Sequence, residues 1–151
     1  MARPVYIIAS QLTAEDKLTN LMSLFSVFES VEFHAGPFTG NQPMPAQQFR
    51  VVAVWMREEG DEAVEFEQQF RFHRPGLGIE DVAAPAPFRF ESPERWLHRF
   101  MLICNSFPPV SASGIFEVES RVRRAGGEDW VSQRYPIRVQ YVPAAESSNQ
   151  P

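Results

Sequence analysis

The sequence predicts an all-β protein, an antiparallel β-sandwich of seven or eight strands. Apolar and polar residues alternate over several short segments, which is the period of a strand with one buried face. Gly and Pro recur between these segments at the spacing of sandwich turns. The 13 prolines leave few segments suited to long helices, and the 13 phenylalanines favour strands. A partly open β-barrel is the alternative architecture.

The clearest element is a hairpin between Gly114 and Tyr141, formed by Ile115–Arg123 and Trp130–Tyr141 around a Gly-Gly turn. Its pairing follows from the alternation of apolar residues, because a slip of one residue would place apolar side chains opposite polar ones. The expected pairs are Val122 with Val131, Val118 with Tyr135, Phe116 with Ile137 and, on the polar face, Glu119 with Arg134. Pro136 has no N–H group and indicates an edge position or a bulge.

The other strands are predicted from alternation or from short apolar runs. In chain order they cover Val5–Ala9, Leu18–Ser30, Phe49–Met56, Val64–His73, Phe88–Phe90 and Phe100–Ser106. In Leu18–Ser30, five apolar residues also keep the spacing of a helix. A strand buried on both faces is preferred there, since Leu24 and Val27 lie off the helical stripe. A tight polar turn joins Phe49–Met56 to Val64–His73 and predicts a second hairpin.

Connections and domain limits follow from Pro, Gly and polar residues. His34–Gln48 and Arg74–Pro87 are predicted loops, and Ser92–Trp96 is a predicted helical turn with Pro at its first position. Residues 1–142 are expected to form a single domain with one core. The tail, residues 143–151, has little to bury and is expected to be disordered.

Two stretches resemble a family of small bacterial β-sandwich domains of unknown function. The first is Lys17-Leu18-Thr19-Asn20-Leu21-Met22-Ser23-Leu24-Phe25 after an extended N-terminal strand. The second combines Pro109, Gly114-Ile115-Phe116-Glu117-Val118 and Tyr135-Pro136-Ile137-Arg138-Val139. The resemblance implies an immunoglobulin-like sandwich in which the Leu18 segment is a strand. It implies no activity and no catalytic residues.

Charge and composition argue against several classes of protein. The net charge is −5, and the only basic cluster, Arg121, Arg123 and Arg124, includes two residues that share a strand face with Glu117 and Glu119. Nucleic-acid binding normally needs a continuous basic stripe, so it is not expected. The chain has no apolar run long enough for a membrane span and one cysteine, which excludes an internal disulfide. The first apolar run, Val5–Ala9, is too short for a signal peptide, and a bacterial cytoplasmic location is expected.

No motif predicts an enzyme, a cofactor or a metal. His34, His73 and His98 lie in three different segments, without a second ligand at metal-binding spacing, and are expected to be surface or loop residues. Cys104 lies in an apolar run and is expected to be inert packing. Three acidic groups are interpreted as solvated features rather than as calcium or acid–base sites. They are the turn with Glu58, Glu59, Asp61 and Glu62, the pair Glu65 and Glu67, and the pair Glu117 and Glu119.

Three functions are therefore considered. The preferred one is a non-catalytic protein-interaction or assembly module that binds an unidentified protein or forms a homodimer. Its candidate interface is Trp130, Arg134 and Arg138, because Trp and Arg are enriched at interface centres. The alternative is a small-ligand or carbohydrate binder that uses Trp55, Trp96 or Trp130 as a stacking surface. The third is an enzyme whose site combines distant loops around the histidines and Cys104.

Overall fold

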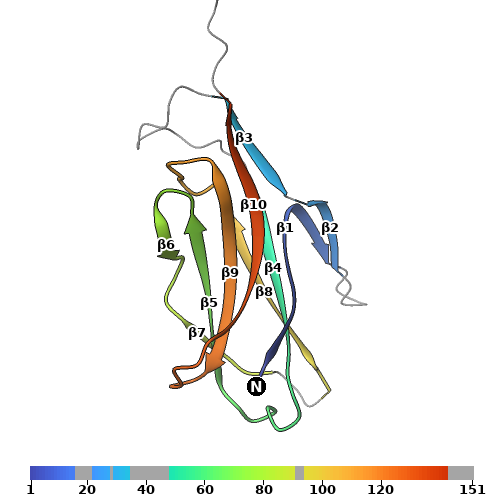
Figure 1. Ribbon diagram of the computed structural model, residues 1–151. Helices are drawn as coiled ribbons and strands as arrows, with labels where there is room; N and C mark the ends of the chain where they lie inside the picture. Colours follow the sequence, from blue (N-terminus) through green and yellow to red (C-terminus); the bar gives the residue numbers. More distant parts are fainter. Residues whose placement is uncertain (16–21, 28, 35–47, 91–93, 143–151) are drawn as a thin grey trace, which may run out of the picture.

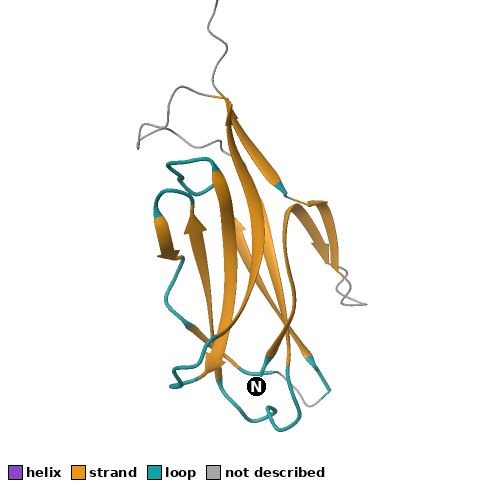
Figure 2. Ribbon diagram, in the orientation of Figure 1, coloured by secondary structure: helices purple, strands orange, loops and turns teal. Residues whose placement is uncertain are grey.

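Ten strands in two sheets make up the computed structural model, which describes residues 1–15, 22–27, 29–34, 48–90 and 94–142. Sheet A contains, in spatial order, β2 (Met22–Val27), β1 (Arg3–Glu15), β4 (Phe49–Met56) and β8 (Leu97–Cys104). Sheet B contains β3 (Ser30–His34), β10 (Val131–Val142), β9 (Gly114–Arg124), β5 (Phe66–Arg74) and β6 (Gly78–Asp81), with β7 (Ala86–Phe88) also paired to β5. The sheets face each other and do not close into a barrel (Figures 1 and 2). The predicted sandwich is confirmed, with more strands than expected.

The β9–β10 hairpin has the predicted register. Val122 pairs with Val131, Val118 with Tyr135, Phe116 with Ile137 and Glu119 with Arg134. Strand β3 joins β10 in parallel from Arg138 onward, so Pro136 lies in the part of β10 that pairs only with β9. The expected edge position of this proline is confirmed within the described chain.

The predicted second hairpin is wrong. Phe49–Met56 is a strand with the expected bounds, but β4 pairs with β1 and β8 in sheet A, whereas β5 pairs with β9, β6 and β7 in sheet B. The polar turn between β4 and β5 therefore carries the chain from one sheet to the other. Alternation along a strand identifies which of its faces is buried. It does not show whether the next strand along the chain pairs with it in the same sheet or belongs to the opposite sheet, because both arrangements bury the same face.

Several boundaries also differ from the prediction. Strand β1 extends well beyond Val5–Ala9, and β3 and β6 were not predicted as separate strands. The preference for a strand over a helix is confirmed at Met22–Val27, while residues 18–21 lie outside the described part. Glu94–Trp96, the described part of the predicted helical turn, form no helix. Most of the predicted His34–Gln48 loop and the whole 143–151 tail also lie outside the described residues.

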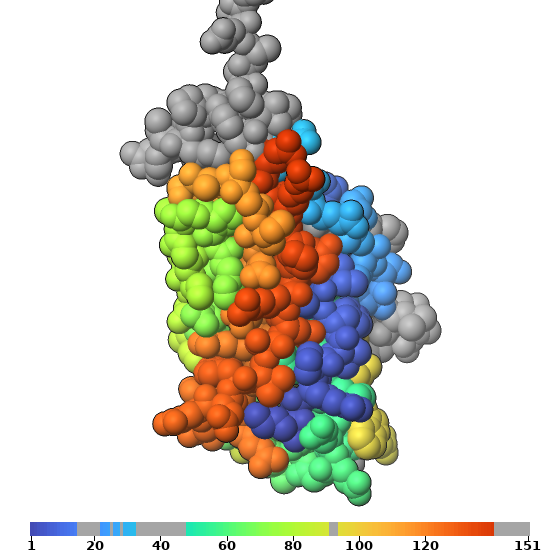
Figure 3. Space-filling model, in the orientation of Figure 1, coloured from blue at the N-terminus to red at the C-terminus, as the bar shows by residue number. Residues whose placement is uncertain are grey.

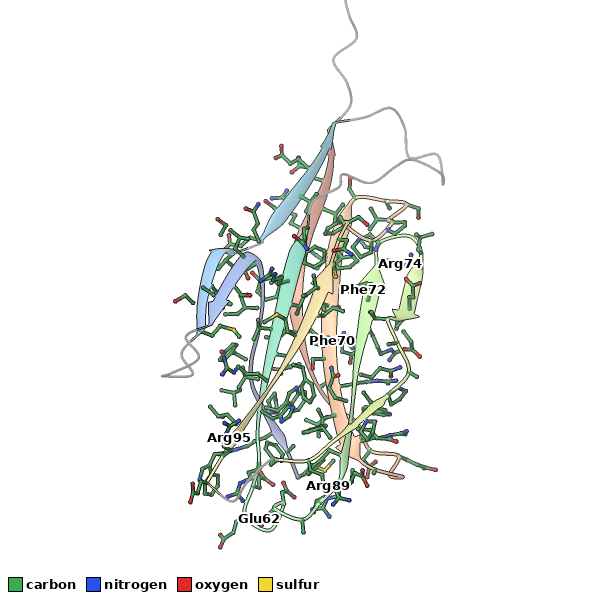
Figure 4. All side chains as sticks on the ribbon, turned by 180° about the vertical axis from the view of Figure 1, so that it is seen from behind. Glu62, Phe70, Phe72, Arg74, Arg89 and Arg95 are labelled. Carbon is green, nitrogen blue, oxygen red and sulfur yellow. The ribbon has the colours of Figure 1, made fainter. Side chains whose placement is uncertain are left out.

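The core lies between the sheets and consists of alternate residues from both. Trp55 and Phe116 are fully buried at its centre, one from each sheet. The indole Nε1 of Trp55 donates a hydrogen bond to Oγ of Ser120, 3.1 Å away, so its polar group is satisfied inside the core. The ring of Phe116 lies 5.2 Å from that of Phe72 and 4.8 Å from that of Phe107. Phe72 comes from β5, in sheet B, as does the neighbouring Phe70 (Figure 4).

Candidate functional site

A network of charged side chains covers the outer face of sheet B. Strands β5, β9 and β10 lie side by side there and form one continuous surface (Figure 3). The register places Glu119 of β9 between Arg71 of β5 and Arg134 of β10. Because directly opposite residues in antiparallel strands share a face, these three side chains project together from the sheet. The alternation of residues along β9 thus places Glu119 on the same face as the two arginines.

Glu119 is the centre of this network and is only 4% exposed, which corrects the expectation that its carboxylate is solvated. Its Oε2 lies 2.6 Å from Nε2 of His73, and its two oxygens lie 3.8 Å from Arg71 and Arg134. A carboxylate only accepts hydrogen bonds, so Nε2 of His73 carries the hydrogen. Burial alone would raise the pKa of Glu119, but hydrogen bonds from His73 and Ser132 and the charge of Arg134 outweigh it. The pKa therefore lies below its usual value.

Two further arginines form a second part of the same surface. Arg123 pairs with Glu67 at 2.6 Å, and Arg121 donates from Nε and Nη2 to the amide oxygen of Gln69 at 3.0 and 2.5 Å. Burial and the charge of Arg71 lower the pKa of Arg121, although a guanidinium remains charged at neutral pH. Both arginines lie against the ring of Trp130, with their Cζ atoms 4.1 and 4.5 Å from its centroid.

The predicted interface residues are not brought together as one exposed patch. Trp130 does lie on the polar side of its hairpin, but it is half-buried against Arg121 and Arg123. Arg134 is paired with Glu117 at 3.3 Å. Arg138 is exposed further along β10, beside a separate hollow that also includes Ile115. Two of the three side chains therefore have partners within the chain.

The histidines are placed differently from the prediction. His73 and His98 are half-buried strand residues rather than surface or loop residues. The ring of His98 packs against Phe88 and Phe100, with centroids 4.8 and 4.6 Å apart. His34 ends β3, and its side chain lies outside the description. Among the described residues, no group of three or more His, Cys, Asp or Glu side chains could hold a metal.

The remaining candidates for catalysis and metal binding are Cys104 and the acidic turn that contains Asp61. Burial raises the pKa of the Cys104 thiol to about 12, so the reactive thiolate is scarce near neutral pH. Asp61 is buried rather than solvated, which corrects the prediction for the acidic turn. It accepts hydrogen bonds from the N–H of Glu58 at 3.1 Å and from Arg124 at 3.2 Å. Burial would raise the pKa of Asp61, but the bond from Glu58, the amino group of Met1 at 3.1 Å and the bond from Arg124 together hold it below its usual value.

The tryptophans offer little open ring surface. Trp55 belongs to the core and is inaccessible to a ligand. Trp96 is half-exposed, but Cζ of Arg57 lies 4.3 Å from its ring centroid. The cation on each accessible indole occupies part of the surface that a sugar would contact.

The outer face of sheet A has the opposite character, and sequence reasoning missed it. In β4, Val51, Ala53 and Trp55 point into the core, so Val52 and Val54 point outward. Across the sheet, Ile8 of β1 and Met101 of β8 flank Val52. The outer face thus carries apolar side chains, of which Val52 and Val54 are buried and Met101 is 42% exposed.

Strand β8 forms the open side of this apolar face. Four residues of this strand point outward: Arg99, and the apolar Leu97, Met101 and Ile103, which are 52%, 42% and 51% exposed. A groove of about 550 Å³ runs along the first half of the strand. Its lining residues are Met22, Val52 and 94–101. Arg95, at the start of this lining, lies at the end of the molecule that also carries Glu62 and Arg89 (Figure 4). The signal in the sequence was the run of apolar residues on both faces of Phe100–Ser106, which was used only to predict a strand.

Two observations bear on the wider class of the protein. No described helix has the length and apolar character that crossing a membrane requires. No protein-family model and no curated protein matches the chain.

Proposed function

We propose that this chain is a non-catalytic protein-interaction module whose binding surface is the apolar outer face of sheet A together with strand β8. The observation that carries the proposal is the row of half-exposed apolar residues on β8, Leu97, Met101 and Ile103. Single exposed apolar residues are common on soluble proteins. Three on one strand, beside a groove and next to the buried Val52, form a patch that only Arg99 interrupts, of the kind that marks interaction sites.

The contrast between the two outer faces supports this choice of surface. On sheet B, the charged groups near Glu119 and Trp130 are engaged with one another, and binding a partner there would require some of these contacts to be exchanged. On sheet A, a partner would cover apolar surface that now faces water, which is favourable by roughly 25 cal/mol per Å². We therefore place the interaction surface on sheet A rather than at Trp130, Arg134 and Arg138.

The other two functions have weaker support. Carbohydrate binding relies on open tryptophan faces, whereas Trp96 and Trp130 lie against arginines and Trp55 is buried. Catalysis relies on a reactive group in a cleft. The Cys104 thiol is held protonated, and the pair of His73 and Glu119 lies on a sheet face away from the groove beside β8.

The test is capture from an extract of the native host by the immobilised chain, in native form and as Met101→Lys. The matched control is Ile79→Lys, which places the same charge at an exposed apolar site on β6, in sheet B. A captured protein, including native copies of this chain, supports the proposal only if its purified form binds again and Met101→Lys weakens binding about tenfold or more. Equal binding to both variants would contradict the proposal.

A further inference from the structure

Among the described strands, β8 forms a long sheet edge that lacks the usual protection against pairing. Natural edge strands are kept short, interrupted by proline or bulges, or charged. In the described part of the chain, the edges β2, β3, β6 and β7 span only six, five, four and three residues. The stretch of β1 before Ser10, which pairs only with β4, contains Pro4 and a register shift, and Pro136 interrupts the unpaired part of β10. In contrast, β8 pairs with β4 over eight consecutive positions without a register shift, and it contains no proline. Its one charged residue is Arg99.

We propose that a second copy of this chain pairs antiparallel along β8, about a two-fold axis at Phe100. This inference rests on the proposed function and names its partner. The two copies of sheet A would join into one sheet of eight strands, with β8 of one copy beside β8 of the other. A two-fold interface uses the same patch twice, so the strand must be complementary to itself.

The sequence of β8 selects this register. Residues directly opposite in an antiparallel pair share a face, which allows axes only at single residues. With the axis at Phe100, Leu97 lies opposite Ile103 at both ends, and Arg99 lies opposite Met101. An axis at Arg99 would place the two arginines directly against each other, and an axis at Met101 would place Leu97 opposite Asn105. Among these three axes, only the one at Phe100 gives both Leu97 and Ile103 apolar partners, and it opposes no like charges.

The inner face of the strand is compatible with the same axis. Phe100 would face its own copy, and His98 would face Leu102. In each copy Phe88 of β7 already packs against both aromatic rings, 4.7 Å from Phe100 and 4.8 Å from His98. The axis would therefore bring two aromatic clusters together at the side of the sandwich, and such contacts are favourable beyond their buried area.

Sedimentation equilibrium of the full chain tests the association. We expect a dimer at tens of micromolar, a concentration range that reports weak association. Met101→Lys should weaken the dimer about tenfold or more, and Ile79→Lys, on sheet B, should leave it unchanged. A 17.2 kDa monomer up to about 100 μM would overturn the proposal. So would a dimer that persists in Met101→Lys but is weakened by Trp130→Ala, since that result places the contact on sheet B.

Disulfide trapping tests the register in a Cys104→Ala background. Arg99→Cys and Met101→Cys chains should cross-link with each other when mixed, because these positions face one another across the axis. Cross-linking of Arg99→Cys with itself alone would move the axis to residue 99, and cross-linking of Met101→Cys with itself alone would move it to residue 101. Either result would overturn the proposed register.

Comparison with the capture experiment separates the two proposals. If the chain is monomeric but still binds a different purified protein through Met101, the second copy is wrong and the interaction module stands. If neither association nor capture depends on Met101, both proposals fail.

Discussion

Replacement of Glu119 by alanine should destabilise the fold by about 2 kcal/mol, well above the cost for an exposed ion pair. The magnitude follows from its surroundings. Breaking a fully buried ion pair costs about 3–5 kcal/mol, and an exposed pair contributes about 0–1 kcal/mol. Glu119 is 4% exposed, but Arg71 and Arg134 keep other carboxylates, at 2.9 Å from Asp81 and 3.3 Å from Glu117. The unsatisfied group left behind is mainly His73, which places the cost between the two limits.

Glu117→Ala is the matched control, because Glu117 lies on the same strand and the same face but is 31% exposed. Its loss should cost less than about 1 kcal/mol. Urea unfolding followed by tryptophan fluorescence measures both, since Trp55 is buried in the folded state. Equal losses for the two variants would refute the argument that the network buries Glu119.

The effect of Glu119 should also depend on pH. Its pKa is lower in the folded chain than in the unfolded chain, so the unfolded state binds the proton more readily. The stabilising contribution is therefore complete above the ordinary carboxyl pKa of about 4.3 and disappears as the pH falls through the folded value. The difference in free energy of unfolding between the native chain and Glu119→Gln should shrink from pH 7 to pH 3. An unchanged difference would show that ionisation of Glu119 does not stabilise the fold.

Three further outcomes are expected. Phe116→Ala should lower the free energy of unfolding by about 3–5 kcal/mol in the same urea assay, because its ring is fully buried between the sheets; a loss under about 1 kcal/mol would mean that the core is wrongly placed. Cys104 should react with iodoacetamide at pH 8 far more slowly in the folded chain than in urea, because its pKa is about 12; equal rates would contradict its burial. Deletion of residues 144–151 should leave the Tm unchanged, because the tail has little apolar surface to bury, and a clear drop would show that it packs on the sheets.

The register of the β9–β10 hairpin could be predicted from the sequence because the two strands are neighbours along the chain. A short turn limits the pairing to a few registers, and alternation then selects one. In this register Phe116 lies opposite Ile137 on the apolar face, and Glu119 lies opposite Arg134 on the polar face. Pairing between distant strands has no such limit. The connection from β4 to β5 could have closed a hairpin, and the sequence contains no local signal that sends it to the other sheet.

The burial of Glu119 could not be predicted for a related reason. Alternation correctly places Glu119 on the outer face of its strand. Its exposure depends on the side chains beside it, and its main partner, His73, is 46 positions away in the sequence. Where long side chains from three adjacent strands meet, they exclude water from the carboxylate at their centre. The sequence of one strand therefore determines the face from which a side chain projects, whereas the exposure of that side chain depends on the neighbouring strands of the sheet.

Strand β8 is a second case in which exposure could not be predicted from the sequence, but here it is apolar residues that are exposed. Apolar residues on both faces of a strand are typical of a central position between covered layers, and Phe100–Ser106 was predicted as a strand with this pattern. The structure places the strand at an edge, with Met101 and Ile103 half-exposed. The apolar pattern and the edge position are consistent with each other if β8 is central in a larger sheet completed by a second copy. The exposed apolar residues of this strand are thus the ones that a dimer would cover, and Met101→Lys tests this.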